Sequence, residues 1–486
     1  MGRKIFLVYP DEKTHLTRLP LSLLAIGSVL VKNGFEVKII DLRFQDYTKF
    51  DYSDSVFVGV STLTGKQLKY ALKFSEYIKR KYPQIPVVWG GIHVTLLPTQ
   101  SVLNKNVDIV VRGEGEITAI ELAKALVKKT SLSKIKGLTY KDKKGQVISN
   151  SDRPFMNLND LPPMAYELYD SNKSKTTLGH FPYNSSRGCP HRCKFCYNTA
   201  FNKRRWRARD ADKVLADIKR IINLTNTKGL EFTEDEFFVD KSRVEKISKG
   251  LIDENIKIDW TTSCRFDYFA KYGLDFIKLV KNSGCSTLSF GGESGSKKVL
   301  EMITKDITID DMLKTVAKCK QTGIVPVISF MCGFPYETKQ DILQTLNTID
   351  KIHKINPKAH INGLFGFTPY PGTPLFEESL KLNSKLPQNL EEWSEYNFST
   401  LASQIWLDKR YKSWLETASA IVRYNYFNQT KMAYQNLPSK FLYLPYFIFN
   451  NLYRVSALLR WRFRFFSFGY EWKFWSFLKE AYSGHY

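Results

Sequence analysis

The chain has 486 residues, of which 43% are hydrophobic and 25% charged, and its formal net charge is +24. These fractions lie near globular averages, so they exclude a largely disordered chain and a protein with many membrane spans. The length predicts several domains. The positive charge indicates either solvated lysine-rich helix faces or an anionic partner, a membrane surface or a phosphorylated substrate. No zinc-finger spacing, RNP-like strand or Arg-rich arm is present, so no nucleic-acid partner is expected.

The N-terminal sequence and the cysteine content indicate the compartment. The first thirteen residues, MGRKIFLVYPDEK, contain one short apolar run, which is neither a signal peptide nor a membrane span. Seven cysteines in a long cytoplasmic chain are better explained as metal ligands or buried thiols than as disulfides. We therefore expect a cytoplasmic protein.

The first 140 residues alternate between apolar runs and amphipathic segments. Strands are expected at 4–9, 35–41, 55–60, 85–89 and 107–111, and helices at 19–33 and 66–81. This alternation predicts an α/β fold with an N-terminal doubly wound, Rossmann-like parallel sheet. Its ligand is expected beyond the carboxyl ends of the strands.

Residues 136–180 lose this pattern. A Lys-rich, hairpin-like stretch is followed by NLNDLPPMAYELYD, whose paired prolines are typical of an extended linker. The sequence therefore predicts a boundary between two domains near residues 150–180.

The alternation then resumes in longer units. Strands are expected near 181–186, 229–233, 257–262, 286–290, 324–331 and 360–367, and helices at 210–224, 241–254, 273–282, 308–321 and 338–353. About six strand–helix repeats predict a partial (βα)6 TIM-type barrel with its chemistry at the C-terminal rim of the strands.

From about residue 376 the sequence becomes helical, aromatic and basic. No stretch there reaches the roughly 18 uncharged apolar residues that span a bilayer. Aromatic residues interleaved with arginine suit a helix lying at a membrane interface. They also suit a helical region that packs on the barrel with arginines extending around its edge. The sequence leaves both interpretations open.

Three of the seven cysteines are clustered in a loop that follows a predicted strand. Cys189, Cys193 and Cys196 stand in SSRGCPHRCKFCYN with the spacing C-x3-C-x2-C. Three soft thiolates suit an iron–sulfur cluster, and three rather than four leave one iron open to a further ligand. A Cys3His zinc site that includes His191 is the competing metal site. The other cysteines are expected to be buried thiols: Cys264, Cys285, Cys319 and Cys332.

The loop resembles the signature of the radical S-adenosylmethionine (SAM) superfamily, C-x3-C-x-aromatic-C, with Phe195 as the aromatic residue. The resemblance implies that the three cysteines hold a [4Fe–4S] cluster whose open iron binds SAM. It also implies that Phe195 packs beside the adenine. One electron from a reductant such as flavodoxin or ferredoxin then cleaves SAM to a 5′-deoxyadenosyl radical.

Downstream strand ends extend this resemblance over residues 231–240, 289–305 and 330–341. Glu234 and Asp235 match the acidic segment after the second strand, and either is a candidate for contact with the SAM amino group. The segment after the fourth strand, which contacts the ribose and the amino-acid end of SAM, is matched by Gly291, Gly292, Glu293 and Ser294. Met331 and Gly333 would line the adenine site.

The loops of the N-terminal sheet resemble the cobalamin-binding domain that precedes the barrel in a large branch of this superfamily. No G-x-G-x-x-G follows the first strand, which argues against a dinucleotide site. The expected cobalamin contacts are Ser61, Thr62, Leu63, Thr64, Gly90, Gly91, His93, Val94, Gly113 and Glu114. The motif D-x-H-x-x-G is absent, so the lower cobalt ligand stays undefined, and His15 is interpreted as a surface residue.

The expected organisation is a cobalamin-binding domain at 1–140, a linker at 141–180, a radical SAM partial barrel at 181–375 and a helical region at 376–486. The resemblance implies methylation of an unactivated carbon in a small-molecule or lipid substrate. An oxidative or ring-forming reaction without methyl transfer is the alternative, and a non-catalytic cobalamin or redox sensor is an alternative from another class. Methylthio transfer is disfavoured, because no cysteine precedes Cys189. The basic C-terminus would add peripheral contact with the inner face of the membrane.

Overall fold

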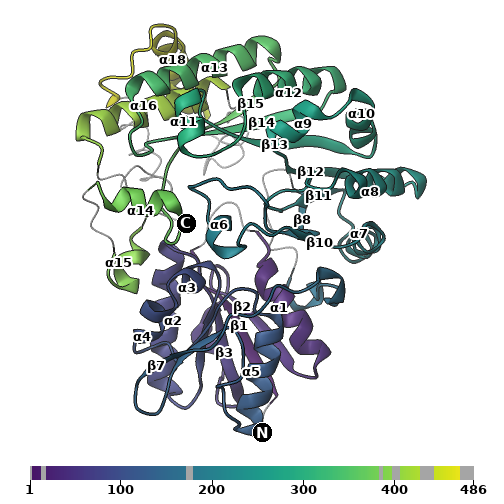
Figure 1. Cartoon of the computed structure of the whole chain (residues 1–486), viewed down its shortest axis with the longest axis vertical. Coiled ribbons are helices and arrows are strands. Elements are labelled where there is room, and N and C mark those ends of the chain that lie inside the picture. Colours follow the sequence, from purple (N-terminus) through teal and green to yellow (C-terminus); the bar gives the residue numbers. More distant parts are fainter. Residues whose placement is uncertain are drawn as a thin grey trace.

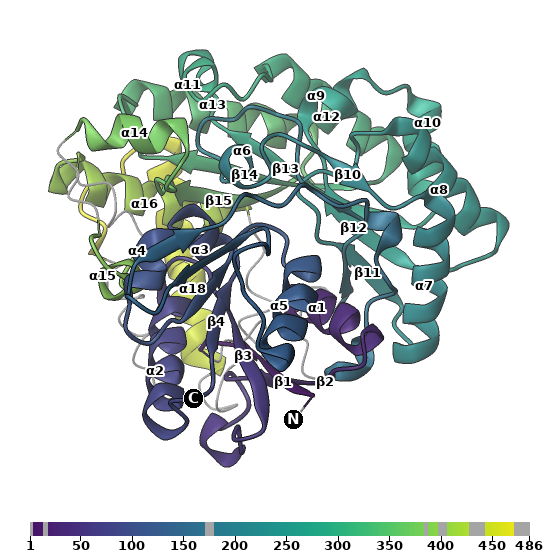
Figure 2. The same cartoon turned by 60° about the horizontal axis from the view of Figure 1, so that its bottom comes forward.

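The computed structural model describes residues 3–12, 18–170, 179–382, 387–396, 406–426 and 443–470. They form two large sheets, each covered by helices, and the carboxyl ends of the strands face one another across a set of loops (Figure 1). The view in Figure 2 shows the second sheet curving over the first. The α/β class predicted from the sequence is confirmed. His15 lies outside the described residues.

The first sheet has seven strands in the order β2-β1-β3-β4-β5-β6-β7. The first five strands pair in parallel, and the last two are antiparallel. The strands are β1 (Lys4–Tyr9), β2 (Glu36–Asp41), β3 (Ser55–Ser61), β4 (Val87–Gly90), β5 (Ile109–Val111), β6 (Leu138–Lys141) and β7 (Val147–Ser149). The helices are α1 (Leu21–Lys32), η1 (Tyr47–Lys49), α2 (Lys66–Lys81), α3 (Ile92–Leu96), α4 (Pro98–Leu103) and α5 (Glu116–Lys128).

Helices cover both faces of the first sheet, which explains why its strands are apolar at successive positions. Ile5 and Leu7 of β1 face the cluster that contains residues of α1 and α5. Phe6 and Val8 face the other cluster, which includes residues of α2. Side chains alternate between the faces of a strand, so a strand covered on both sides is apolar throughout.

The first sheet extends past residue 140, where the sequence suggested that the first domain ends. The β6–β7 hairpin adds two strands beside β5, because alternate residues of β6, such as Leu138, pack into the core. The chain from there to residue 170 contains η2 (Leu158–Asp160) and η3 (Tyr166–Leu168) and lies along α1. The Ala165 amide donates to Ser28 Oγ at 2.7 Å, so this connection is fixed to the first sheet's helical layer.

The second sheet has six parallel strands in the order β15-β14-β13-β12-β11-β8, with β8 and β15 at its two edges. Its strands are β8 (Phe181–Tyr183), β11 (Gly229–Phe232), β12 (Asp259–Ser263), β13 (Cys285–Glu293), β14 (Val325–Cys332) and β15 (His360–Gly366). Its helices are α7 (Ala211–Thr225), α8 (Lys241–Asp253), α9 (Phe266–Lys271), α10 (Leu274–Asn282), α11 (Lys297–Met302), α12 (Ile309–Thr322) and α13 (Lys339–Ile355). The predicted partial barrel is confirmed.

The C-terminal helices contact both sheets. They are α14 (Pro374–Leu380), α15 (Leu390–Ser394), α16 (Lys409–Tyr426) and α18 (Tyr443–Arg462). Trp393 of α15 belongs to the core cluster of α2, whereas α16 packs on β15, where the Arg423 guanidinium lies over the Phe365 ring at 5.2 Å. The C-terminal helices therefore contact both the barrel and the layer of helices that covers the first sheet. Among the described residues, the hydropathy of every helix falls short of that of a bilayer-crossing segment.

Candidate active site between the two sheets

The cysteine loop begins at the carboxyl end of β8 and is closed at its base by a short antiparallel ladder. The ladder pairs β9 (Ser186–Arg187) with β10 (Arg207–Ala208), and α6 (Asn198–Phe201) lies within the loop. Gly188, which precedes Cys189, has φ +84°, and a Cβ there would lie 2.0 Å from the Arg205 carbonyl oxygen. Only glycine fits this close approach of two backbone segments, which fixes where the loop leaves the ladder.

The three cysteines of the loop are free thiols, Cys193 buried and the other two half-buried. Burial raises the pKa of Cys189 to about 12 and that of Cys196 to about 11, so iron must displace their protons when it binds. Among the described residues, no three His, Cys, Asp or Glu side chains converge on one point, as the ligands of a single ion would. In a [4Fe–4S] cluster each thiolate binds its own iron, so its three cysteines need not converge on one point.

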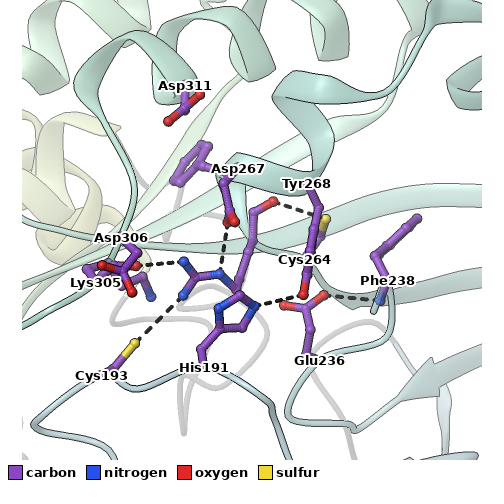
Figure 3. Close-up of polar contacts among 12 residues, drawn as sticks. His191, Cys193, Glu236, Phe238, Cys264, Asp267, Tyr268, Lys305, Asp306 and Asp311 are labelled. Atoms are coloured by element: carbon purple, nitrogen blue, oxygen red, sulfur yellow. Dashed lines mark hydrogen bonds and ion pairs between the residues drawn. The ribbon is translucent and has the colours of Figure 1, made fainter. Parts of the chain in front are cut away.

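Residues of the barrel contact the cysteine loop at His191 and Cys193 (Figure 3). The Arg265 guanidinium donates to Cys193 Sγ at 3.7 Å and to the Lys305 carbonyl oxygen at 2.6 Å. The His191 ring makes a 2.8 Å hydrogen bond with the Tyr268 hydroxyl, so this bond occupies its Nε2. The Arg265 guanidinium therefore joins the cysteine loop to the barrel segment that carries Lys305.

A cavity of about 290 Å³ opens inside the barrel next to these residues, and we call it the barrel cavity. Its wall is made by Asp235, Glu236, Ser263, Cys264, Arg265, Ser289, Phe290, Gly291, Glu293, Lys305 and Ser329. All of these residues lie at or near the carboxyl ends of β11 to β14 or in the segments that follow. This is the rim at which a barrel of this type carries its chemistry.

A buried ion pair forms part of the barrel cavity wall. Lys305 Nζ lies 2.6 Å from a carboxylate oxygen of Glu293, and both side chains are 9% exposed. Glu293 has φ +58°, an uncommon conformation for a residue with a Cβ, and such strain is concentrated at functional sites. A Cβ on Gly291 would lie 2.3 Å from the same carboxylate, so glycine there makes room for the pair.

Three successive acids after β11 have different surroundings. Glu234 is buried and accepts hydrogen bonds from the Ser185 amide and from both serine hydroxyls of the β8–β9 link. Asp235 accepts from the Gly188 amide at 3.1 Å and from the Tyr197 hydroxyl at 2.8 Å. Glu236 lines the barrel cavity, where burial raises its pKa to about 8. Asp235 and Glu236 therefore reach the cavity, while Glu234 anchors β8 to β11.

The remaining residues predicted for SAM lie around the barrel cavity rather than in its wall. Phe195 is half-buried, 6.0 Å from the Phe334 ring. Gly292 faces the core, where a Cβ would lie 2.9 Å from Phe330. The Ser294 hydroxyl makes a 3.1 Å hydrogen bond with Thr345. Met331 is half-buried against the core, and Gly333, at φ +79°, forms the turn after β14. Their expected roles stay predictions.

Glu337 fixes that turn and is expected to make stability depend on pH. It accepts from the Gly333 amide at 2.6 Å, and burial raises its pKa to about 8. An unfolded glutamate releases its proton near pH 4.3, so this contribution to stability is complete below that pH and is lost as pH rises to about 8. The free energy of unfolding should fall by about 1.4 kcal/mol per pH unit for each such carboxyl.

The Glu337→Gln variant should therefore show a smaller decrease in stability between about pH 5 and pH 8 than the wild type. Urea unfolding of the cluster-free protein at several pH values measures this decrease in the free energy of unfolding. The exposed Glu301, paired with Lys297 at 3.7 Å, provides the control, because Glu301→Gln should keep the wild-type slope. An unchanged slope in the Glu337 variant would contradict the assignment.

A second cavity, of about 400 Å³, lies between the two sheets, and we call it the inter-sheet cavity. From the first sheet it is lined by five residues predicted for cobalamin: Ser61, Gly90, Gly91, Gly113 and Glu114. It continues beneath α1 and α5 along apolar residues, among them Leu23, Ile26, Ala119 and Leu122. Its volume is in the range of small-molecule sites.

Glycines keep the first-sheet side of the inter-sheet cavity open. A Cβ on Gly113 would meet no atom within 4 Å, and one on Gly90 would meet only the Val111 carbonyl oxygen, at 3.9 Å. Gly91 differs, because at φ +116° its Cβ would lie 2.4 Å from the Thr62 carbonyl oxygen. Gly90 and Gly113 thus leave space for a ligand, and Gly91 allows close backbone packing.

The barrel closes the inter-sheet cavity from the opposite side. Asn184, Arg187, Tyr197, Phe201 and Asp235 belong to its wall. Asp235 lines both cavities, so the inter-sheet cavity and the barrel cavity lie on either side of this residue. A ligand on the first sheet and one in the barrel would therefore approach each other beside the cysteine loop.

The other predicted cobalamin contacts do not line the inter-sheet cavity. The Thr62 hydroxyl donates to the Gly90 carbonyl oxygen at 2.9 Å, and Leu63 is exposed. Thr64 Oγ1 lies 2.9 Å from His93 Nδ1, and the buried His93 ring is 5.8 Å from the Trp393 ring. Burial lowers the pKa of His93 to about 4. Val94 belongs to the core. These residues shape the loops that carry the glycines.

Acidic residues of the first sheet are joined to basic residues of the cysteine loop. Glu114 lies 2.7 Å from Arg207 and 3.2 Å from Arg187, and Arg187 also lies 2.6 Å from Glu116. Both acids follow β5, and both arginines belong to the ladder at the base of the loop. This network holds the cysteine loop against the rim of the first sheet.

Sequence reasoning missed several residues of the site: Arg187, Glu236, Arg265 and Lys305. Glu236 and Arg265 follow β11 and β12 within four residues, so their place at barrel strand ends was a usable signal. Lys305 follows α11, and nothing local indicates that it returns to Glu293. Arg187 precedes the signature by two residues, and only the packing of the two sheets gives it partners.

Comparisons with known proteins agree with this arrangement. The family profile "Radical SAM superfamily" matches residues 183–349, and "B12 binding domain" matches residues 14–123. An uncharacterized methyltransferase of Pyrococcus horikoshii is 33% identical over 81% of this chain and 86% of its own length. The anaerobic magnesium-protoporphyrin IX monomethyl ester cyclase of a Synechocystis strain is 25% identical over 68% of each chain.

A solved structure has the same fold. It is the cobalamin-dependent S-adenosylmethionine radical enzyme OxsB with aqua-cobalamin bound, at a TM-score of 0.71 and 18% identity, over 94% of this chain and 72% of that one. The two profiles, the relative at 33% identity and this shared architecture agree. The chain therefore belongs to the cobalamin-dependent radical SAM enzymes, whose cofactors are a [4Fe–4S] cluster, SAM and cobalamin.

Proposed function

We propose that this enzyme methylates an unactivated carbon of a small-molecule or lipid substrate held between the two sheets. The observation that carries the proposal is that Asp235, which is hydrogen-bonded to the cysteine loop, lines both cavities. A methyl donor held by the first sheet and a radical generated in the barrel would reach one substrate there. The methyltransferase name of the relative at 33% identity supports this reaction over other radical outcomes.

Cys189, Cys193 and Cys196 would hold the cluster, and the barrel cavity with Asp235, Glu236 and Glu293 would hold SAM. Carboxylates suit the positive sulfonium and ammonium groups of SAM. The glycine-lined inter-sheet cavity would hold cobalamin, with its apolar extension under α1 and α5 receiving part of the ligand. When bound, these cofactors supply a 5′-deoxyadenosyl radical and a transferable methyl group.

The protein's own residues would position the cysteine loop and shield the reacting groups from water. Asp235 holds the Gly188 amide and the Tyr197 hydroxyl, which fixes both ends of the cysteine loop. Glu114 binds Arg187 and Arg207, which keeps the loop against the first sheet. Trp393 of the C-terminal region packs in the core cluster of α2, which adds a further contact between the first sheet's helices and the rest of the chain. Holding reactants in one geometry and excluding water favour radical transfer over side reactions.

Replacing Gly90 by valine tests the proposal, because it should block cobalamin and leave SAM cleavage intact. Gly90 ends strand β4, its Cβ has room, and a larger side chain there would occupy the inter-sheet cavity. Wild-type protein reconstituted anaerobically with cluster and cobalamin, then given SAM and a reductant, should form 5′-deoxyadenosine and S-adenosylhomocysteine. The variant should form only 5′-deoxyadenosine and should bind cobalamin at least about tenfold more weakly.

Gly273→Val is the matched control, because a Cβ on Gly273 would also have room, with no atom within 4 Å, and Gly273 lies in neither cavity wall. It should behave as the wild type. Wild-type protein that retains cobalamin and forms 5′-deoxyadenosine without any S-adenosylhomocysteine would contradict methyl transfer. That outcome would favour the ring-forming reaction, as in the relative named a cyclase.

A further inference from the structure

Helix α18 and the turn after it expose an apolar surface. Its inner face packs against α16 through Tyr453, Ala457 and Trp461, which are buried and spaced four residues apart. The opposite side and the turn carry exposed apolar side chains, and we call them the outer face: Leu452, Val455, Leu458, Leu459, Phe463, Phe465, Phe468 and Tyr470. Leu452 is 66% exposed, and Phe463 is 72% exposed.

This pattern differs from that of an ordinary surface helix, which is apolar only on the side facing the core. Half of the exposed large hydrophobic residues in the described part of the chain, eight of sixteen, belong to the outer face. Single exposed apolar residues are common, but contiguous groups mark surfaces that contact a partner or a membrane. Within the described part of the chain, the outer face therefore has the character of a contact surface.

The turn that completes the outer face is held in place by hydrogen bonds. Arg460 donates to the Ser467 carbonyl oxygen at 2.8 Å and to the Phe468 carbonyl oxygen at 3.1 Å. The rings of Phe468 and Tyr470 are stacked, with centroids 6.3 Å apart. The exposed aromatic rings thus belong to a folded, hydrogen-bonded surface.

The charge of this segment indicates which occupant fits. Residues 443–470 contain four arginines and no aspartate, glutamate or lysine. Arg464 pairs with Asp350, whereas Arg454 and Arg462 are exposed beside the apolar residues. At 100° per residue, Arg462 lies on the same side of the helix as Val455 and Leu459. The outer face is therefore both apolar and cationic.

We propose that the outer face of α18 docks on an anionic membrane surface, with its apolar side chains inserted shallowly between lipid headgroups. Exposed Leu and Phe next to arginine are the composition of helices that lie in a membrane interface. A second copy of the chain fits poorly, because a symmetric interface would bring these arginines against themselves without any carboxylate in the segment. The proposal does not depend on the methyl-transfer reaction.

Vesicle sedimentation with the full-length protein tests it. We expect wild-type protein to sediment with vesicles of phosphatidylcholine containing about 30% phosphatidylglycerol, and to bind pure phosphatidylcholine vesicles at least about tenfold more weakly. Raising the salt from about 0.15 M to about 0.5 M should weaken the binding. The triple variant V455S/L459S/F463S should lose at least about tenfold in partitioning, and R454Q/R462Q should lose the preference for phosphatidylglycerol.

The matched control replaces three exposed apolar residues elsewhere, as L103S/L224S/I252S, and should bind as the wild type does. Circular dichroism and thermal unfolding check that each variant is folded. Wild-type protein that stays in the supernatant with phosphatidylglycerol vesicles overturns the proposal. So does a folded outer-face variant that binds as the wild type, and so does a wild-type dimer that this variant converts to a monomer, since a second copy would then cover the surface.

Discussion

Replacing Cys193 by alanine is expected to abolish the cluster and, with it, all formation of 5′-deoxyadenosine from SAM. Cys193 is the buried cysteine of the loop, and its Sγ lies 3.7 Å from the Arg265 guanidinium. A cluster held by three thiolates has no spare protein ligand, so the loss of one leaves two irons without a cysteine. The same result is expected for Cys189→Ala and Cys196→Ala.

The measurements are the iron and sulfide content of anaerobically reconstituted protein and the yield of 5′-deoxyadenosine with SAM and a reductant. The loop itself should keep its conformation, because the Lys194 amide donates to the Ile303 carbonyl oxygen at 2.9 Å. Cys319, buried in α12, supplies the control: Cys319→Ala should retain full iron content. Wild-type iron in the Cys193 variant would show that other residues hold the cluster.

Replacing Lys305 by methionine is expected to lower the free energy of unfolding by about 3–5 kcal/mol, because it leaves the Glu293 carboxylate buried without its partner. The two groups are 2.6 Å apart, and each side chain is 9% exposed. Changing both residues, as E293Q/K305M, removes the unpaired charge and should restore most of the stability. It should not restore SAM binding if Glu293 contacts the amino-acid end of SAM.

Urea unfolding of the cluster-free protein gives the stabilities, and equilibrium binding of SAM to the reconstituted protein gives the affinities. The surface pair Lys314–Asp310, also at 2.6 Å, provides the comparison. Lys314→Met should change stability little, because exposed pairs contribute little. A Lys305→Met variant as stable as the wild type would mean that solvent reaches Glu293 and that the pair is not buried.

The secondary structure was largely predictable because its signals are local. The helix expected at residues 66–81 is α2, and the strand expected at 4–9 is β1, with the same bounds. The strand expected at 85–89 begins two residues later, at Val87, directly after Pro86, which has no amide hydrogen for the ladder. The spacing of apolar residues identified the helices and strands, because an element that is buried on one or two faces must carry apolar side chains at regular intervals.

The cysteines of the candidate site were predictable for the same reason. Three cysteines within eight residues form a local pattern that needs no knowledge of the fold. The residues that surround them were not. Glu234, Asp235 and Glu236 are consecutive acids after one strand, and their sequence does not tell which bonds to a neighbouring strand and which faces a cavity. Side-chain direction at the end of a strand depends on the twist and on neighbouring strands.

The loops of the first sheet place some of the residues expected for cobalamin in a cavity wall and others in the core. Ser61, Gly90 and Gly113 line the inter-sheet cavity. Thr64 and His93, from the same loops, are hydrogen-bonded to each other, and His93 packs against Trp393, which is 300 residues further along the chain. A strand-end loop points some side chains at the ligand and others into the core, and the sequence pattern does not separate them.

By itself, the sequence determined the order of the elements, the two sheets and the cysteine loop, because each depends on residues close together along the chain. Only the tertiary structure decided that Asp235 lines two cavities, that Lys305 pairs with Glu293, and that the apolar side chains of the outer face of α18 are exposed among the described residues. These features depend on the packing of segments that are distant in sequence. Packing is set by the whole set of contacts, and no local pattern encodes it.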